Sequence, residues 1–190
     1  MSSIYLALVH YPVKNRAGDP ITTAITNLDI HDLARLSRTY GLAGYCIVTP
    51  ITAQRELVER VLGHWDTGPG KERLPTRSEA LSLVTVAASI QDVVSAIAAQ
   101  QGQRPRLIAT AATSSVDTVS YGEARRQLEN TSVPSLILLG TGHGLANSVL
   151  EEADQVLAPI QGISDRYNHL SVRTAAAIII DRLLGDVLPP

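Results

Sequence analysis

The residues of greatest chemical interest lie in 136-LILLGTGHGL-145, where an apolar run ends at the glycines Gly140, Gly142 and Gly144. A phosphate-binding P-loop needs a lysine and a serine or threonine after its last glycine, but this loop continues with Leu145 and Ala146. A dinucleotide-binding fingerprint would place its third glycine one residue later and would need more strands downstream. One glycine suffices for a tight turn, whereas three suggest close approach to the backbone. The loop therefore favours a neutral ligand such as adenosine.

Two further polar loops are expected near this one. The segment 159-PIQGISDRYNHLSVRT-174 runs into an alanine-rich helix, for which Ser171 is the expected N-cap. The segment 110-TAATSS-115 follows another apolar run. Parallel α/β sheets bind ligands beyond the carboxyl ends of their strands, so the three loops together predict one binding site.

Other kinds of chemistry find little support. The histidines have no metal-ligand spacing, and neither a His-Glu-x-x-His motif nor a Gly-x-Ser-x-Gly motif occurs. We therefore expect no metal ion. The single cysteine, Cys46, lies in an apolar run and is expected to be a buried, unreactive thiol. His143 fits equally a general base and a solvent-exposed turn residue.

Short β-branched runs alternate with stretches of helical period along the whole chain. The expected strands cover 4–12, 45–50, 81–87, 106–112, 134–140 and 155–160, and the expected helices cover 28–41, 51–65, 90–102, 121–130, 145–153 and 171–185. Turn residues make 13–27 and 66–79 expected loops. Strands apolar on both faces, alternating with helices, indicate a parallel sheet covered by helices. The prediction is one α/β domain over residues 1–190.

Composition limits the partners. The formal net charge of -2 argues against a strong positive field over the whole domain, although it allows a local basic patch. The first residues, MSSIYLALVHYP, have no basic region, and their apolar stretch is too short for a signal peptide or a membrane span. We therefore expect a cytoplasmic protein that does not bind a membrane.

The order of these motifs resembles a known family. A strand, the loop LGTGHGL, a helix, a strand ending in Ala-Pro-Ile, and Asn-His-Leu-Ser-Val-Arg before an alanine-rich helix are similar to the C-terminal half of the SPOUT (α/β-knot) RNA methyltransferases. The stretch 10–41 looks like a bacterial group of stand-alone RNA methyltransferases in that superfamily. The resemblance covers nearly the whole chain. It implies a C-terminal deep trefoil knot, S-adenosylmethionine (SAM) as cofactor, a homodimer, and tRNA or rRNA as substrate.

The resemblance also implies which residues hold SAM. They belong to three loops: Thr110 and Ala111 in the first; Leu139, Gly140, Thr141, Gly142, His143, Gly144 and Leu145 in the second; and Ile160, Gly162, Asn168, His169, Leu170, Ser171 and Val172 in the third.

Two departures from the pattern concern the methylated group. Arg35 stands where ribose-methylating members carry an arginine near the target nucleotide, six residues before a glycine, here Gly41. Those members have asparagine six residues before that arginine, whereas this chain has Asp29. Their final motif reads Ser-Leu-Asn-Val-Ser, whereas this chain has 169-HLSVR-173. The departures favour methylation of a base over ribose.

Methyl transfer is an in-line attack, for which an enzyme positions the reactants and supplies a base for any proton lost. The candidate bases are Asp29, Asp165, His143 and His169, while Arg35 and Arg166 are expected to hold RNA phosphate. Arg35 also fits an exposed helix charge, and Asp29 also fits a carboxylate at a helix N-terminus.

Two other functions stay open at this point. One is a non-catalytic nucleotide-binding or RNA-binding module that keeps the knot pocket. The near-neutral net charge and the lack of a separate RNA-binding domain keep this alternative open. The other, less favoured, is a NAD-type oxidoreductase.

Overall fold

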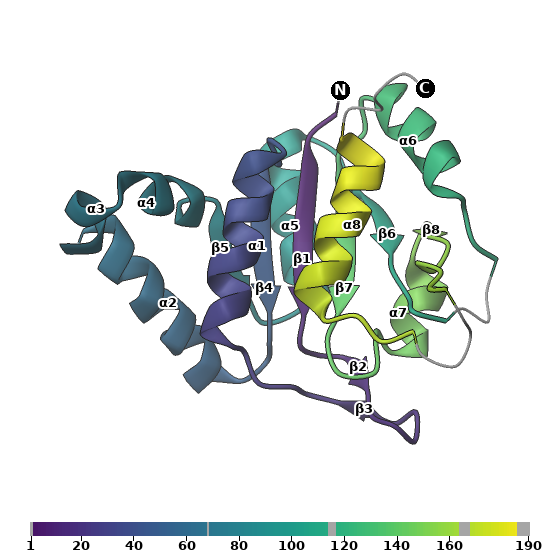
Figure 1. The fold of residues 1–190 in the computed structure, drawn as a ribbon, viewed down its shortest axis with the longest axis horizontal. Helices are drawn as coiled ribbons and strands as arrows, with labels where there is room; N and C mark the ends of the chain where they lie inside the picture. Colours follow the sequence, from purple (N-terminus) through teal and green to yellow (C-terminus); the bar gives the residue numbers. More distant parts are fainter. Residues whose placement is uncertain (1, 68, 114–116, 164–167, 186–190) are drawn as a thin grey trace.

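The computed structural model describes residues 2–67, 69–113, 117–163 and 168–185. Its centre is a six-stranded sheet in the order β5-β4-β1-β7-β6-β8, in which each neighbouring pair is parallel (Figure 1). The strands are β1 (Ile4–Val9), β4 (Gly44–Val48), β5 (Val84–Ala87), β6 (Arg106–Ala109), β7 (Ser135–Gly140) and β8 (Gln155–Val156). The predicted α/β class with a parallel sheet is confirmed.

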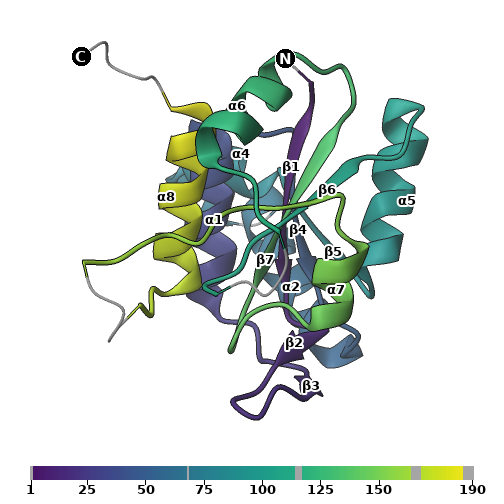
Figure 2. The ribbon, with the colours of Figure 1, turned by 90° about the vertical axis from the view of Figure 1, so that its right-hand side faces the viewer.

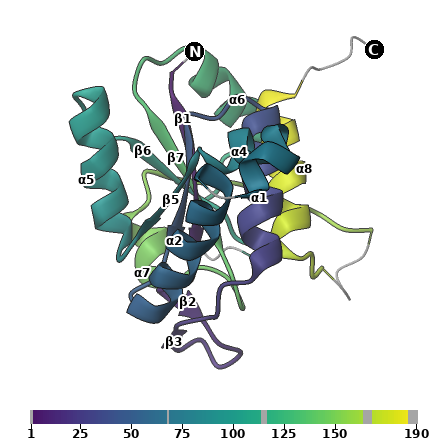
Figure 3. The same ribbon diagram turned by 90° about the vertical axis from the view of Figure 1, so that its left-hand side faces the viewer.

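Helices cover both faces of the sheet. They are α1 (Asn27–Thr39), α2 (Thr52–Asp66), α3 (Pro69–Arg73), α4 (Pro75–Leu81), α5 (Ile90–Gln101), α6 (Tyr121–Glu129), α7 (Asn147–Glu152) and α8 (Val172–Leu184). Figure 2 shows the sheet edge-on, with α1, α6 and α8 on one side and α5 and α7 on the other. Figure 3 shows the opposite edge, where α2 and α4 lie beside α1. Because both faces are covered, the central strands can be apolar throughout.

β1 shows how one apolar run serves two cores. Ile4, Leu6 and Leu8 belong to the core under α1, α6 and α8, whereas Tyr5, Ala7 and Val9 belong to the core under α5 and α7. Successive side chains of a strand point to opposite faces, so every residue of β1 is buried.

Local signals set the ends of α1 and α8. The Thr26 hydroxyl caps α1 by accepting a hydrogen bond from the backbone N–H of Asp29. Gly41 follows this helix with a φ of +66°, which favours glycine. Ser171 caps α8 by accepting from the N–H of Thr174, which confirms the predicted N-cap.

The prediction that 66–79 is a loop was wrong. This segment contains α3 and the beginning of α4, and Leu81, expected to start a strand, ends α4. Proline was taken as a helix breaker, but Pro69 and Pro75 each occupy a first helical turn, where proline is tolerated. The buried Ala80 and Leu81 anchor α4 to the core. The expected loop 13–27 contains a short antiparallel pair, β2 (Val13–Lys14) and β3 (Pro20–Ile21).

Strand lengths also differ from the prediction. β8 has only two residues where six were expected, and β6 ends at Ala109 rather than at residue 112. Both are at the side of the sheet where the loops of the candidate site begin. In the described part of the chain, no helix has the length and apolar character to cross a bilayer.

Candidate active site

The three loops proposed from the sequence follow three neighbouring parallel strands, β7, β6 and β8. They therefore lie together at the carboxyl ends of these strands, which we call the carboxyl edge of the sheet. Thr110 follows β6 and donates hydrogen bonds from its backbone N–H and its hydroxyl to the carbonyl of Leu138, at 3.2 and 2.9 Å. After β8, the N–H of Leu157 donates to the carbonyl of Ala109 at 2.9 Å. The loops therefore begin side by side, as the ligand-binding edge of a parallel sheet requires.

The glycines of the second loop are required by the folding of the loop itself. A Cβ atom on Gly140 would lie 2.4 Å from the backbone nitrogen of Leu145, which no side chain tolerates. Gly142 and Gly144 have φ angles of +61° and +98°. The side chains of Leu139 and Leu145 are buried in the core, so only their backbone groups are available to a ligand. From the three glycines we inferred that a ligand approaches the backbone closely. The structure shows that part of this close approach is between residues of the loop itself.

The glycine loop is braced by the segment just after β1. The N–H of Lys14 donates to the carbonyl of Gly144 at 2.8 Å, and the N–H of His143 donates to the carbonyl of Lys14 at 3.1 Å. The Thr141 hydroxyl donates to the carbonyl of Val9 at 3.1 Å and also contacts the hydroxyl of Thr23. Sequence reasoning missed this brace, because no local pattern links residues more than a hundred positions apart.

His10 completes the brace from inside the protein. Its Nδ1 lies 2.9 Å from the Thr23 hydroxyl oxygen, and its side chain is fully buried. Burial lowers the pKa of His10 to about 4, against the opposing effect of the Asp29 carboxylate. The imidazole is therefore neutral at physiological pH. Its Nε2 has no hydrogen-bond partner among the described residues.

The third loop leads into α8. The side-chain amide of Asn168 donates to the carbonyl of Ile160 at 2.8 Å and so joins the two ends of this loop. His169 and Leu170 are exposed beside the start of α8. The candidate base Asp165 and the candidate phosphate ligand Arg166 lie outside the described residues.

Asp29 is held by two partners. The Thr26 hydroxyl donates to one carboxylate oxygen at 2.5 Å, and Arg173 on α8 donates from Nη1 to the other at 3.1 Å. The Asp29 side chain is only 8% exposed, so this ion pair is largely shielded from water. Arg173 also contacts Asp32, with Nε 3.5 Å from Oδ2. Asp29 thus joins α1 to α8, and its role as a general base stays a prediction.

The two departures from the ribose-methylating pattern therefore meet in space. Asp29 stands in place of asparagine and Arg173 in place of the last serine, and the two side chains are paired. A buried carboxylate requires such a partner, since an unpaired charge in the interior is costly. The replacements are physically coupled.

Two further predicted residues, Arg35 and His143, are exposed. Arg35 lies on the surface of α1, 62% exposed, with its Nη1 4.0 Å from the carboxylate of Asp32. This weak pairing leaves the guanidinium accessible, and both interpretations of Arg35 stay open. His143 is exposed at the tip of the glycine loop.

The residues of the three loops fit SAM. Among those proposed to bind it there are hydroxyls, an amide, glycines and apolar residues, but no lysine or arginine. Such a set suits an adenosyl group without phosphate, held through backbone groups and shape. Within the described residues, no group of three or more His, Cys, Asp or Glu side chains is arranged to hold a metal ion.

Comparison with known families agrees with this geometry. A family model described as SAM-dependent RNA methyltransferase matches residues 3–185. The chain belongs to this family. The description of this family names SAM as the cofactor and RNA as the molecule that is methylated.

The relatives of this chain are of two lengths. A protein of Oleidesulfovibrio alaskensis named tRNA (guanine-N(1)-)-methyltransferase is 50% identical over 98% of this chain, which covers 43% of that relative. A protein of Nitratidesulfovibrio vulgaris with the same name is 45% identical over 97% of this chain and 42% of its own length. The chain thus spans less than half of these relatives. An uncharacterised protein of Aquifex aeolicus is 40% identical over 96% of this chain and 89% of its own length.

Solved structures of methyltransferases share the fold of this chain. TrmJ from Z. mobilis has a TM-score of 0.59 at 17% identity, covering 100% of this chain and 72% of its own. The SpoU methyltransferase AviRb from Streptomyces viridochromogenes, in complex with AdoMet (SAM), has a TM-score of 0.53 at 16% identity, covering 96% and 57%. At these identities the likenesses show the fold alone. The predicted family, SAM-dependent RNA methyltransferase, is confirmed by the family model, and membership of the SPOUT superfamily stays a prediction.

Proposed function

We propose that this RNA methyltransferase acts as a homodimer and transfers the methyl group of SAM to a base of tRNA. The observation that carries the proposal is the placement of the three predicted loops at one edge of the sheet, in a chain matched from residue 3 to residue 185 by the family. The names of the longer relatives support tRNA as the RNA. Because the match covers less than half of those proteins, the proposal does not include guanine N1 as the methylated atom.

The proposal includes a knot that shapes the SAM site. The N–H of Leu157 donates to the carbonyl of Ala109, and the N–H of Ala158 donates to the carbonyl of Val119, each at 2.9 Å. Ala109 is the last residue of β6, and Val119 lies near the end of the connection from β6 to α6, two residues before that helix begins. The chain after β8 therefore lies between the two ends of this connection. Such a contact is what threading through the 110–118 loop would produce, and it supports the knot.

The coupled pair of Asp29 and Arg173 supports a base as the methylated group. In this chain the α1 position that is asparagine in ribose-methylating members is a carboxylate with both oxygens hydrogen-bonded. Its side chain is only 8% exposed, and this burial limits its access to a ribose hydroxyl.

The chemistry asks for positioning more than for reactive groups. SAM supplies a methyl group attached to a positively charged sulfur. The attacking atom of the base forms a bond to the methyl carbon while the carbon–sulfur bond breaks and its electrons pass to sulfur. The three loops orient the two reactants in line, and Arg35 holds RNA phosphate nearby. His169 or Asp165 accepts the proton if the attacking nitrogen carries one.

A second function is favoured by one observation. The chain matches less than half of the relatives named for tRNA methylation, so the named activity of those proteins can reside in their other part. In that case the matched part would bind SAM or RNA without catalysis. Methyl transfer by the isolated chain decides between the two.

The test uses methyl-labelled SAM and unmodified tRNA transcripts. We expect label in the tRNA, and alkaline hydrolysis should release it as a methylated mononucleotide. An alkali-resistant dinucleotide would show ribose methylation and reject the base assignment. Binding of SAM without any transfer to tRNA or rRNA would favour the non-catalytic function. Light scattering should give twice the mass of the 20.3 kDa chain.

A further inference from the structure

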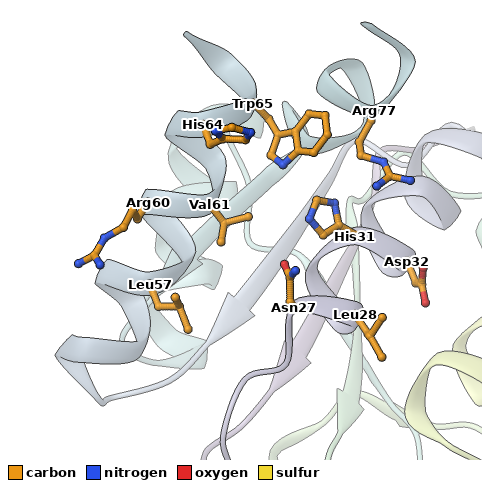
Figure 4. Close-up of a pocket in the computed structure, with 10 residues that line it drawn as sticks. All are labelled: Asn27, Leu28, His31, Asp32, Leu57, Arg60, Val61, His64, Trp65 and Arg77. Atoms are coloured by element: carbon orange, nitrogen blue, oxygen red, sulfur yellow. The ribbon is translucent and has the colours of Figure 1, made fainter. Parts of the chain in front are cut away.

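A groove lies outside the SAM site, between α1, α2 and α4 (Figure 4). Its volume is about 580 Å³, and none of the residues proposed to bind SAM lines it. Figure 4 shows His31 of α1, Trp65 of α2 and Arg77 of α4 pointing toward one another. Leu28 and Leu57 also line the groove and are 59% and 45% exposed. Two large apolar side chains are therefore left open to a ligand.

The upper part of the groove is an aromatic cluster. The Cζ atom of Arg77 lies 5.5 Å from the centroid of the Trp65 ring. The rings of His31 and His64 meet Trp65 edge-on, with centroids 5.7 and 5.5 Å away. Tryptophan and arginine side chains that already face one another offer flat surfaces for a nucleobase.

The charge of the groove is positive. In the described part of the chain, neither Arg60 nor Arg77 forms an ion pair, whereas the carboxylate of Asp32 is shared between Arg173 and Arg35. Burial lowers the pKa of His31, Arg77 and Arg35 lower it further, and the carboxylate of Asp32 opposes them, so the net shift favours the neutral imidazole. Arg35 lies four residues after His31 on α1, so the two side chains are on the same face of this helix. Cationic groups therefore continue from Arg35 into the groove.

We propose that this groove binds an unpaired nucleotide of the RNA substrate. The base packs against Trp65 and the exposed leucines, and the phosphates contact Arg77 and Arg60. Proteins that bind single-stranded RNA combine these same elements, an aromatic platform and cations along the backbone. The inference rests on the proposed function only in taking RNA as the partner.

Trp65 provides a direct probe, because it is the single tryptophan of the chain. A seven-nucleotide RNA of mixed sequence should quench its fluorescence. The double variant Arg60→Ala/Arg77→Ala should bind this RNA about tenfold more weakly, with the slope of log K against log salt reduced by about 1.4 for two phosphates on a single strand. For tRNA methylation the same variant should raise KM and leave both kcat and the SAM affinity unchanged. Arg104→Ala removes an arginine at the opposite end of β6, which is paired with Asp154, and serves as the control.

A second pair of variants separates stacking from folding. Trp65 packs partly against the core, so its replacement can lower stability. Trp65→Phe keeps a flat ring, whereas Trp65→Leu keeps only apolar volume. If the ring stacks on a base, Trp65→Phe should retain most of the affinity for tRNA, whereas Trp65→Leu should bind tRNA about tenfold more weakly. The melting temperatures of the two variants should be equal, so that the difference in affinity does not come from a difference in folding.

Three results would overturn the inference. They are unchanged tRNA affinity and KM in Arg60→Ala/Arg77→Ala, tighter binding of AMP than of the seven-nucleotide RNA, or dissociation of a dimer by the double variant. The last would make the groove a subunit contact. RNA binding at Trp65 without methyl transfer by the wild type would keep the groove assignment and reject the proposed function instead.

Discussion

The carboxyl edge of the sheet and the outer side of α1 differ in how they can hold a ligand. At the edge, the loops after β6, β7 and β8 offer glycines, hydroxyls and backbone groups, and the glycine loop is fixed by hydrogen bonds to Val9 and Lys14. Along α1, the two arginines Arg35 and Arg38 are exposed, and Arg38 is paired with Glu79. The first region suits an uncharged adenosyl group held by shape, and the second suits RNA phosphate. Variants should therefore affect SAM and RNA separately.

The largest effect is expected from Gly140→Ala at the edge. The new Cβ would meet the backbone of Leu145 and Gly144 at 2.4 and 2.7 Å, so the loop must move. We expect SAM affinity in calorimetry to fall by roughly 100-fold and stability to fall by about 1–3 kcal/mol. Gly63→Ala is the matched control, since it lies in α2 with open space around its Cβ and should leave SAM binding unchanged. Normal SAM affinity in Gly140→Ala would show that this loop does not touch the cofactor.

The next effect concerns the link between α1 and α8. Arg173→Ala leaves the buried Asp29 carboxylate without its cation, which should cost roughly 2–3 kcal/mol in urea unfolding. This is less than for a fully buried pair, because Arg173 is 31% exposed. The double variant Asp29→Ala/Arg173→Ala should regain part of the loss. If the two single variants simply add, the pair is not coupled and the argument from the two departures fails.

A similar effect is expected from pH at the brace of the glycine loop. The pKa of His10 is about 4 in the folded protein, against 6.5 for an ordinary histidine. The unfolded chain therefore binds a proton that the folded chain does not, and stability present above pH 6.5 is lost as the pH falls toward 4. Between pH 7 and pH 5 this amounts to about 2 kcal/mol.

The control for this prediction is His10→Asn, which keeps a hydrogen-bonding group for Thr23 without titrating. Urea unfolding of this variant should depend less on pH than unfolding of the wild type. Equal pH dependence of the two proteins would mean that His10 is not the titrating group.

The smallest effect is expected from Arg35→Ala on α1. Loss of one phosphate contact should raise KM for tRNA about tenfold and leave SAM affinity unchanged, because Arg35 is exposed and does not line the edge of the sheet. Arg38→Ala, on the same helix and paired with Glu79, is the control. If Arg35→Ala methylates tRNA like the wild type, Arg35 is an ordinary surface charge.

The sequence by itself determined much of this protein. Alternation of apolar strands with helices predicted the parallel α/β sheet, and the order of the strands in the chain placed three polar loops at strand ends. Ser171 was correctly predicted as the N-cap of α8. These features depend on neighbours within a few residues, so periodicity and capping signals are enough to read them. The helices in 66–79 were not predicted, because proline occurs both in the first turn of helices and in loops. Only the packing of Ala80 and Leu81 in the core decides between a helix and a loop here.

Only the tertiary structure decided which residues far apart in the sequence contact one another. It paired Asp29 with Arg173 across 144 positions of chain and joined His10, Thr23 and Thr141 behind the glycine loop. It also brought His31, Trp65 and Arg77 together on one groove. No local pattern encodes these contacts, because each exists only after the sheet and its covering helices have packed. Which charges are paired, and which are left for RNA, is therefore a property of the packed fold.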